Sequence, residues 1–478
     1  MIQGLYLITP QGSDEHILHV VREGLRGGVQ VVQYRDKERS EDAKVSLARQ
    51  LVQLCKEAGA TFLINDSAEL AVACFADGVH LGQEDGSVHD ARKILGQDKL
   101  IGVSTRTVDQ ALKAEMAGAD YIGVGSIFPT STKNDAELIG LETLSKVRRA
   151  VKIPLVAIGG IGWMNAAAAL EAGADSLAVI SAISSDPNPA LAARELSLLF
   201  NSKKVPEETR VMTIAGSDSG GGAGIQADLK TITLLGSFGA SAITVLTAQN
   251  TLGVQGLSPA AASFIAKQAE AVITDIGVDT IKTGMLYSAE IVTTVAVLIQ
   301  KYNLLAIIDP VMIAKGGAAL LKQEAIEAVR NQLLPNSYLL TPNIPEAEAL
   351  TGTKIKSLED MEEAAKKLQA MGARHVLLKG GHSDGDAVDL LLAGASVQRL
   401  AAERIDTANT HGTGCSYSAA IATFLAQGQA LSQAAASAKL FINEAIRHAT
   451  PLGGGHGPIN HFAGAKAVKS EREKGKSA

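Results

Sequence analysis

Polar and charged residues follow short apolar segments throughout the first 200 residues of the chain. Arginine, lysine, amide and hydroxyl groups can bind phosphate oxygens, and aspartates are hard oxygen ligands suited to Mg²⁺. Taken alone, each residue is better explained as a cap or a solvated loop residue. Their repetition at successive segment ends instead predicts one site that handles a pyrophosphate with magnesium. The residues concerned are Gln33, Arg35, Lys37, Asn65, Asp66, Asp85, Ser104, Thr130, Thr132 and Lys133.

Small residues close two later apolar segments. Gly159 and Gly160 end one of them, and Ile180 and Ser181 end the next. Glycines allow backbone N–H groups to approach an anion, so these ends predict a second phosphate site. Two anion sites imply two phosphorylated substrates.

A scaffold must bring all these segment ends to one face. Amphipathic helical patterns such as 40–59 and 107–120 separate the apolar segments, and this alternation predicts parallel βα units. Eight such units in about 200 residues predict a compact TIM barrel, whose sites lie at the carboxyl ends of the strands. The predicted strands are 4–9, 29–35, 61–66, 78–82, 100–104, 120–126, 154–160 and 176–181.

A different phosphate-binding device lies late in the chain. The motif THGTGC, Thr410 to Cys415, precedes the helical pattern 415–428. Small residues such as Gly412 and Gly414 leave first-turn N–H groups and the positive end of the helix dipole facing outward, which predicts an anion hole for a transferring phosphoryl group. An ordinary N-terminal cap formed by Thr410 or Thr413 is the alternative.

Three further residues favour the anion hole over the cap. Glu346 can reach Mg²⁺ directly or through water, Lys379 can meet a triphosphate, and Asp309 ends an apolar strand. The second half also alternates strands with helices, which predicts a mainly parallel sheet between helices, and it contains no P-loop motif. The predicted strands are 211–217, 240–249, 279–286, 304–312, 337–342 and 373–381.

Length and composition indicate the domain organisation, the partners and the location of the protein. At 478 residues the chain exceeds a single core, so we expect an N-terminal domain 1–200, a polar linker 201–209, a second domain 210–462 and a disordered charged tail 463–478. A net charge of −6 with 4% aromatic residues argues against nucleic acid as a partner. Three widely spaced cysteines argue against a zinc site or a disulfide framework. We expect neither a membrane span nor a secretory signal, and we therefore expect a cytoplasmic protein. A homo-oligomer stays open.

The first half resembles thiamine phosphate synthase through QYRDK, LINDSAELA, DGVHLGQED, IGVSTRT, YIGVGSIFPTSTK and VAIGGI, over nearly all of residues 1–200. The resemblance implies coupling of hydroxymethylpyrimidine diphosphate to thiazole phosphate, with loss of pyrophosphate. It further implies that Gln33, Arg35, Lys37, Asn65, Ser104 and Lys133 grip the diphosphate, that Asp66 and Asp85 bind Mg²⁺, and that Gly160, Ile180 and Ser181 hold the thiazole phosphate; Thr130 and Thr132 match as well. Ser126 stands where proline is more often expected. A thiazole tautomerase is the competing function on this fold, but it would not need the full set of pyrophosphate residues.

The second half resembles the ribokinase superfamily, and specifically hydroxymethylpyrimidine (phosphate) kinase, through TIAGSDSGGGAGIQADLK, TAQNT, IKTGML, DPVM, TPNIPEAE, LLKGGH and THGTGC. The similarity spans about 211–458 and implies two successive phosphorylations with ATP and Mg²⁺. Gly216, Asp228 and Gln249 match the pyrimidine pocket and its surroundings, whereas Gly412, Gly414 and Cys415 match the anion hole and the catalytic position. A pyridoxal kinase is the alternative enzyme, and a ligand-binding protein that has lost its chemistry is the alternative class.

The general base of the second half stays open between two residues. Sugar kinases of this superfamily mostly carry aspartate where this chain has Cys415. A thiol pKa of about 8.5 can fall at a helix N-terminus, so a thiolate base is physically reasonable near neutral pH. Asp228 is the second candidate, and Cys415 as a small buried residue without a proton-transfer role is the third interpretation.

Overall fold

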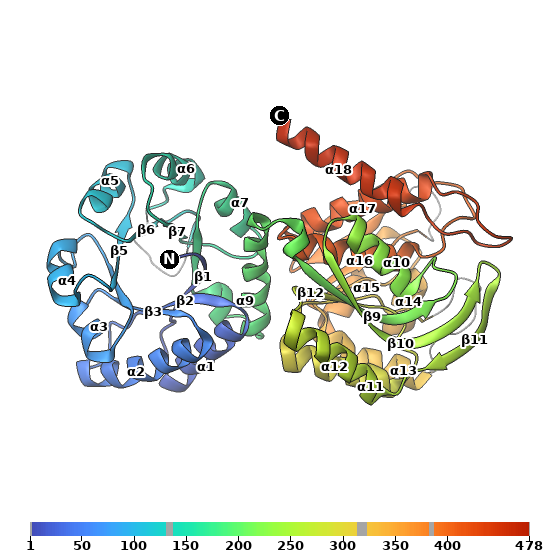
Figure 1. Ribbon diagram of the computed structural model, residues 1–478, viewed down its shortest axis with the longest axis horizontal. Coiled ribbons are helices and arrows are strands. Elements are labelled where there is room, and N and C mark those ends of the chain that lie inside the picture. The colour runs from blue at the N-terminus through green and yellow to red at the C-terminus, as the bar shows by residue number, and fades with distance from the viewer. Residues whose placement is uncertain (1, 131–136, 313–322, 382–386, 478) are drawn as a thin grey trace. The chain divides into compact units, whose positions relative to one another are not determined.

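The computed structural model describes residues 2–130, 137–312, 323–381 and 387–477. Contacts within the chain divide it into two compact units, Met1–Phe200 and Asn201–Ala478. Each unit is described by itself (Figure 1).

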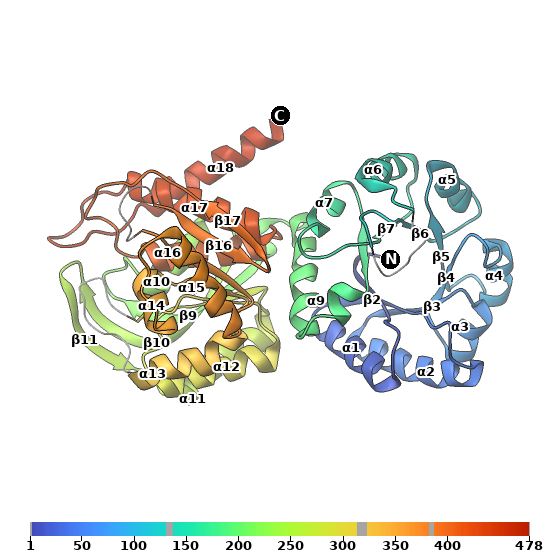
Figure 2. The same cartoon turned by 180° about the vertical axis from the view of Figure 1, so that it is seen from behind.

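The first unit is a closed barrel in which every strand pairs in parallel with its neighbours in chain order, and β1 pairs with β8 (Figures 1 and 2). The predicted TIM barrel is confirmed. Its strands are β1 Gly4–Ile8, β2 Val29–Tyr34, β3 Thr61–Asn65, β4 Gly78–Leu81, β5 Leu100–Thr105, β6 Tyr121–Val124, β7 Leu155–Ile158 and β8 Ser176–Val179. Its helices are α1 Asp14–Arg26, α2 Glu41–Ala58, α3 Ala68–Cys74, α4 Val88–Leu95, α5 Val108–Met116, α6 Gly140–Ala150, α7 Ala166–Glu171, α8 Ser181–Ser184 and α9 Pro189–Leu198.

Hydroxyl side chains define where several barrel helices begin. Ser13, Ser67, Ser87 and Thr107 each accept a hydrogen bond from the backbone N–H three residues later. Such caps stabilise a helix start by about 1 kcal/mol. They also fix the ends of the strand-to-helix loops, which carry the predicted site residues.

The second unit contains, among the described residues, a nine-stranded sheet in the order β11-β10-β9-β12-β13-β14-β15-β16-β17. Strands β10 to β15 in that order pair in parallel, whereas β11, β16 and β17 pair antiparallel at the two edges. The strands are β9 Arg210–Asp218, β10 Phe238–Asn250, β11 Gly253–Pro259, β12 Thr280–Thr283, β13 Ala306–Ile308, β14 Leu339–Leu340, β15 His375–Leu378, β16 Asp389–Ala393 and β17 Ser396–Leu400. The predicted parallel sheet between helices is confirmed, and the three edge strands are additions to it.

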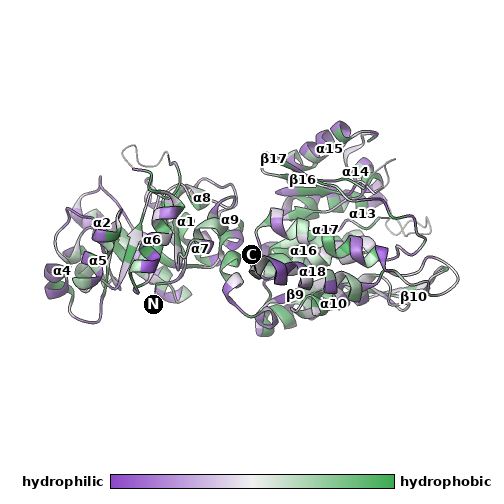
Figure 3. Cartoon of the chain, turned by 90° about the horizontal axis from the view of Figure 1, so that it is seen from above, coloured by the Kyte–Doolittle hydropathy of each residue, from purple (hydrophilic) through white to green (hydrophobic). Residues whose placement is uncertain are grey.

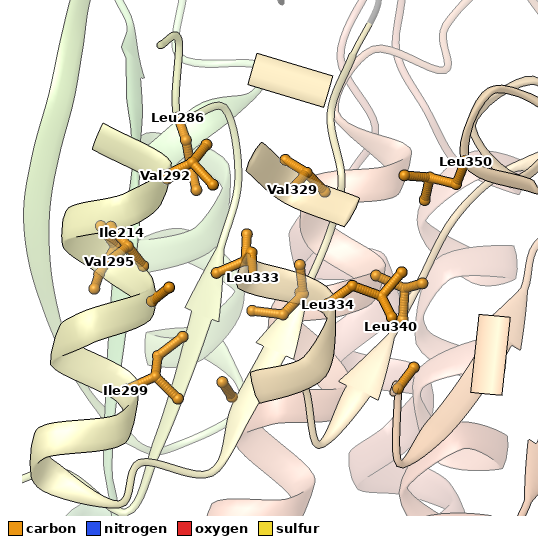
Figure 4. Packing of buried hydrophobic residues seen from close by; sticks show 14 of the residues in the cluster. Ile214, Leu286, Val292, Val295, Ile299, Val329, Leu333, Leu334, Leu340 and Leu350 are labelled. Atoms are coloured by element: carbon orange, nitrogen blue, oxygen red, sulfur yellow. The ribbon is translucent and has the colours of Figure 1, made fainter. Parts of the chain in front are cut away.

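Helices cover this sheet on two sides. The described helices are α10 Gly224–Leu234, α11 Ala262–Ala271, α12 Ala289–Tyr302, α13 Gln323–Ala328, α14 Ile344–Thr351, α15 Leu358–Ala370, α16 Thr413–Ala426, α17 Leu431–Arg447 and α18 His461–Ser477. A large apolar cluster joins sheet residues such as Ile214 and Leu340 to Val295 of α12 and Leu350 of α14 (Figure 4). Helix α16 is apolar nearly all round, with every residue from Ser416 to Ala426 buried, whereas hydrophilic residues lie along peripheral helices such as α4 and α15 (Figure 3).

The segment expected as a polar linker, 201–209, has local structure of its own. The segment forms two short 3₁₀ turns, Leu199–Lys203 and Pro206–Glu208. Asn201 is buried and its Nδ2 donates to the carbonyl of Ala426 over 2.8 Å, and Thr209 Oγ1 lies 2.7 Å from Ser237 Oγ. The two ends of the linker are therefore anchored on the second unit, whereas residues 202–208 between them are exposed.

The expected disorder of the tail 463–478 is also wrong for the described residues, because α18 runs through it. His461, Gly464, Val468 and Arg472 recur at helical spacing and face the second unit. The Arg472 guanidinium lies 5.2 Å from the centre of the Phe424 ring, and its Nη2 donates to Gln427 over 2.8 Å. The tail was predicted to be disordered because it is highly charged, and only these few residues form its packing face. No described helix in either unit combines the length and apolar character that crossing a bilayer requires.

Candidate active sites

The predicted anion-binding residues of the barrel lie at the carboxyl ends of its strands. Gln33 is buried in β2, Asn65 ends β3 and Ser104 lies near the end of β5. Arg35 and Lys37 follow β2 directly, and the backbone N–H of Arg35 donates to Thr9 Oγ1 over 3.0 Å. Thr130 follows β6, but Thr132 and Lys133 lie outside the described residues.

Asp66 and Asp85 form a carboxylate pair at this rim. Burial raises the pKa of Asp66 to about 6, and a hydrogen bond and charge from Asp85 add to the rise, against the opposing charges of Lys37 and Arg35. Asp85 Oδ2 also accepts the backbone N–H of Gly82 over 2.8 Å. Two adjacent carboxylates repel each other when both are ionised, and a divalent cation relieves that repulsion. The pair fits Mg²⁺ with further oxygen ligands from a substrate, since no group of three potential ligands occurs among the described residues.

A hydrogen-bonded chain crosses the barrel interior and was missed by the sequence interpretation. Gln33 Nε2 donates to Tyr6 Oη over 2.8 Å, and Tyr6 Oη lies 3.1 Å from Tyr121 Oη. The chain continues from Tyr121 Oη to His80 Nδ1 over 2.9 Å, and from His80 Nε2 to Ser104 Oγ over 2.9 Å. Burial lowers the pKa of His80 to about 4, so its imidazole is neutral at pH 7. The only signal in the sequence was the inward position of these polar residues on apolar strands.

The loops after β6 and β7 meet where the second anion site was predicted. The N–H of Phe128 donates to the carbonyl of Gly159 over 3.0 Å. Gly160 has a φ of +63°, and a Cβ added there would lie 2.3 Å from the Pro129 carbonyl oxygen, so only glycine fits. Ile180 and Ser181 follow β8 and begin the single turn α8. Ser126, at the position where proline is more often expected, donates its Oγ–H to the carbonyl of Phe128 over 2.8 Å.

The second unit contains a cavity of about 560 Å³. It lies where the ends of β9 and β10 meet the start of α16. Every predicted kinase residue but one lines it: Gly216, Gln249, Asp309, Glu346, Lys379, Thr410, Gly412, Gly414 and Cys415. Asp228 does not.

The start of α16 has the form expected of an anion hole. Gly412 is its N-cap with a φ of +81°, and a Cβ there would lie 1.8 Å from the Gly222 carbonyl oxygen. No side chain of the described residues caps the first turn, because Thr413 Oγ1 instead donates to the carbonyl of Thr410 over 2.7 Å. The first turn is therefore available to an anion rather than closed by a threonine cap.

A lysine and two carboxylates face this helix start. Lys379 Nζ lies 2.8 Å from Asp309 Oδ1, and a Cβ added to Gly414 would lie 3.4 Å from the same Nζ. Glu346 is buried and forms a reciprocal capping box with Asn343 at the start of α14. Burial raises the pKa of Glu346 to about 7, with the charge of Lys379 opposing the rise and that of Asp309 adding to it. These oxygens fit Mg²⁺, and Lys379 fits the phosphates of a nucleotide.

The two candidates for the general base lie in different surroundings. Burial raises the pKa of the Cys415 thiol to about 11, although the charge of Lys282 opposes the rise. This shift favours the neutral thiol, and the side chain is half-buried at the cavity wall. Asp228 is fully buried, with Lys282 Nζ at 2.9 Å and Thr213 Oγ1 at 2.6 Å from its Oδ2. It lies outside the cavity lining, so a role as the base stays a prediction.

The sequence analysis assigned no role to two cavity residues, Asp218 and His411, although both stand in the motifs that carry the resemblance. His411 Nε2 lies 3.0 Å from Asp218 Oδ2. Asp218 also accepts backbone N–H groups of the glycine-rich loop that follows β9, at Gly220 and Ala223, both over 2.8 Å. The pair ties that loop to the THGTGC segment.

Comparisons with known proteins give a family match for each half of the chain. The family model of phosphomethylpyrimidine kinase matches residues 218–460, and that of thiamine monophosphate synthase matches residues 5–183. The thiamine biosynthesis bifunctional protein ThiED of Geobacter sulfurreducens is 50% identical over 98% of this chain and 96% of its own length. A hydroxymethylpyrimidine/phosphomethylpyrimidine kinase of Bacillus subtilis is 49% identical over 53% of this chain and 95% of its own.

Among solved structures, the ADP complex of a Bacillus subtilis pyridoxal kinase covers 53% of this chain and 98% of its own. It is 40% identical, with a TM-score of 0.50. This likeness supports the ribokinase-like fold of the second unit. From the match to ThiED along nearly its whole length, the chain belongs to the family of bifunctional thiamine biosynthesis proteins.

Proposed function

We propose that the chain makes thiamine phosphate with two activities. The second unit phosphorylates 4-amino-5-hydroxymethyl-2-methylpyrimidine and then its monophosphate, using ATP. The first unit joins the resulting diphosphate to 4-methyl-5-(2-phosphooxyethyl)thiazole and releases pyrophosphate. The observation that carries this proposal is that both complete sets of anion-binding residues occur in one chain that matches a bifunctional relative over 98% of its length.

In the kinase, positioning and charge stabilisation account for most of the chemistry. A transferring phosphoryl group needs little covalent assistance, and its charge is spread over its oxygens. The first turn of α16 and the Lys379 ammonium lie close together and supply fixed positive potential for that charge. The neutral Cys415 thiol lies at the cavity wall, where it can orient the substrate hydroxyl.

Metal binding belongs to the proposal as well. Glu346 and Asp309 would hold Mg²⁺ in the kinase, and Asp66 with Asp85 would hold it in the synthase. When bound, Mg²⁺ would neutralise phosphate charge at each site.

In the synthase, the barrel rim stabilises a leaving group. Arg35 and Lys37 place two permanent charges beside the carboxylate pair, and Asn65 and Ser104 add neutral hydrogen-bonding groups. Departure of pyrophosphate leaves a pyrimidine-methyl cation, which the thiazole nitrogen traps. The chain's own residues hold the pyrophosphate and keep the two reactants in reach of each other.

One assay tests the two halves separately. The purified chain receives the pyrimidine alcohol, ATP, Mg²⁺ and thiazole phosphate, and thiamine phosphate should accumulate. In parallel, the pyrimidine diphosphate is supplied directly without ATP. Thiamine phosphate in the first reaction supports both activities, whereas its absence in the second would refute the synthase assignment alone.

Pyridoxal kinase activity is the second candidate for the C-terminal unit, because pyridoxal kinases are among its structural relatives. Competing turnover of the two alcohols by the same chain decides between them. A higher kcat/KM with pyridoxal than with the pyrimidine would favour the second candidate.

A further inference from the structure

The loop between β2 and α2 carries charges of both signs in alternation. Arg35, Asp36, Lys37, Glu38 and Arg39 follow one another directly after β2. Arg35 and Lys37 belong to the proposed diphosphate site, and a carboxylate between them would repel an anion bound there. The contacts of Asp36 show where its charge is held instead.

The carboxylate of Asp36 is turned into the protein, where only 1% of the side chain is exposed. Its Oδ1 accepts the backbone N–H groups of Glu38 over 2.9 Å and of Arg39 over 3.0 Å. Its Oδ2 forms an ion pair with the Arg39 guanidinium. Burial alone would raise the pKa of Asp36, but these N–H groups and the Arg39 charge hold the pKa below its usual value. The buried group is therefore ionised near neutral pH and depends on a cation.

Arg39 also joins this loop to the loop that follows β1. Its Nη2 donates to the carbonyl of Gly12 over 2.7 Å and to Asp14 Oδ1 over 2.6 Å, and its Nε donates to Asp14 Oδ1 over 3.1 Å. A planar guanidinium can meet all these acceptors at once, whereas a lysine ammonium could not. The position of Arg39, and with it that of its Asp36 partner, is fixed from two neighbouring loops.

The other two cations of the loop are held differently. The backbone of Arg35 is fixed by Thr9, whose Oγ1 accepts the Arg35 N–H over 3.0 Å. Neither Arg35 nor Lys37 forms an ion pair within the part of the chain that the structure describes. Both of their charges act on Asp66 at the barrel rim. The loop thus separates one cation that neutralises Asp36 from two that remain unpaired.

We propose that Arg39 is a positioning residue of the synthase, which pairs with the buried Asp36 carboxylate and so keeps Arg35 and Lys37 unpaired for the diphosphate. Without Arg39, Asp36 would be an uncompensated negative charge one position from each of these cations. It would attract them and weaken the binding of the anion. Arg39 itself needs no contact with the substrate. This inference rests on the proposed synthase function.

The experiment uses the full chain with directly supplied pyrimidine diphosphate and thiazole phosphate. Arg39→Met leaves the Asp36 charge uncompensated, so KM for the diphosphate should rise by about tenfold, while KM for thiazole phosphate stays unchanged. Adding Asp36→Asn to Arg39→Met removes that charge. In the double variant, KM for the diphosphate should return to within about threefold of the wild-type value, although two of the native contacts of the loop are then altered.

Two single variants serve as controls. Asp36→Asn keeps an oxygen that can accept the backbone N–H groups and leaves no charge to neutralise, so KM for the diphosphate should stay within about threefold of the wild-type value. Arg26→Met removes an arginine of α1 that is 45% exposed and pairs with Glu23, and it should change neither KM. Kinase turnover of each variant reports whether the rest of the chain is intact.

The possible results are distinguishable. A KM for the diphosphate that stays raised in the double variant, or that rises about tenfold in Asp36→Asn alone, would make the pair merely structural while the synthase function stands. An equal rise of both KM values in Arg39→Met would overturn the inference in the same way. No thiamine phosphate from the wild-type chain would remove the proposed function and the inference together. Recovery in the double variant, with KM for thiazole phosphate constant throughout, is the supporting result.

Discussion

The two candidate sites each contain a carboxylate whose pKa is raised by burial and by a second carboxylate: Asp66 with Asp85 in the barrel, and Glu346 with Asp309 in the kinase. They differ in how the surrounding charges are held. Lys379 is already paired with Asp309, and Glu346 is already bonded to the start of α14. In the barrel, Arg35 and Lys37 influence Asp66 only through charge, and no ion pair to Asp66 occurs among the described residues. Direct bonds thus hold the cation and carboxylates of the kinase site in place, whereas the described cations of the barrel site make no such bond to Asp66.

The strongest test of this difference removes the preorganised cation. Lys379→Met should lower kinase kcat/KM by about 10³-fold, because the substitution removes a fixed charge from a transferring phosphoryl group and leaves Asp309 without its partner. Phosphorylation of the pyrimidine alcohol is measured beside synthase turnover, which should stay unchanged. Lys354→Met serves as control, since that side chain is 80% exposed and pairs only with Glu348 among the described residues.

The corresponding change in the barrel should be smaller. Arg35→Ala removes one bidentate anion contact, and we expect synthase kcat/KM to fall by about 100-fold with kinase turnover unchanged. The neighbouring charge of Lys37 keeps part of the anion attraction. Loss of both activities in this variant would indicate misfolding, and an effect larger than that of Lys379→Met would contradict the proposed difference between the sites.

The sequence predicted the scaffold of both sites well because strand ends and glycine motifs are local features. The strand expected at 29–35 is β2 Val29–Tyr34, and all eight strands of the barrel occur where the apolar segments lie. The kinase strands β11, β16 and β17 were missed, including the buried β16 between β15 and β17. Segments such as Gly253–Pro259 and Ser396–Leu400 are short and largely exposed, so they lack the apolar signal of a central strand.

The sequence could not predict contacts between side chains that lie far apart in the chain. Asp228 looked like a base because its partner Lys282 is 54 positions away, and nothing local reveals their ion pair. Asp218 and His411 are 193 positions apart, so neither motif alone indicates that they meet. The pKa of Cys415 responds to burial and to the charges of Lys282, Asp228 and Asp309, which lie far from it in the sequence. The loop with Thr132 and Lys133 lies outside the described residues, and its role stays a prediction.

The raised carboxylate pKa values predict a pH dependence that separates the sites. A protonated carboxyl is a poor ligand, so the Mg²⁺ concentration for half-maximal rate should rise as pH falls, below about pH 7 for the kinase and below about pH 6 for the synthase. The rise approaches tenfold per pH unit below each pKa. Mg²⁺ titrations of each activity between pH 5 and 8 measure it.

Asp85→Asn sharpens this prediction. It removes the charge that helps to raise the pKa of Asp66, so the synthase midpoint should move to lower pH, although Mg²⁺ binding weakens overall through loss of a ligand. The kinase midpoint is the internal control. A synthase midpoint that moves to higher pH would contradict the charge coupling of the pair.

The smallest effect should come from Cys415, where the two sites are alike in using neutral polar groups beside fixed charges. If the thiol stays neutral and only orients the hydroxyl, Cys415→Ser keeps a neutral group of similar size, and kinase kcat should fall by only about tenfold or less, with little change in KM for ATP. A thiolate base would behave differently: serine could not replace it, and the wild-type rate would rise with pH toward the thiol pKa. Rate profiles between pH 6 and 9.5 for both chains distinguish the two cases. A wild-type rate that climbs tenfold per pH unit above pH 8, with the climb lost in Cys415→Ser, would restore cysteine as the base.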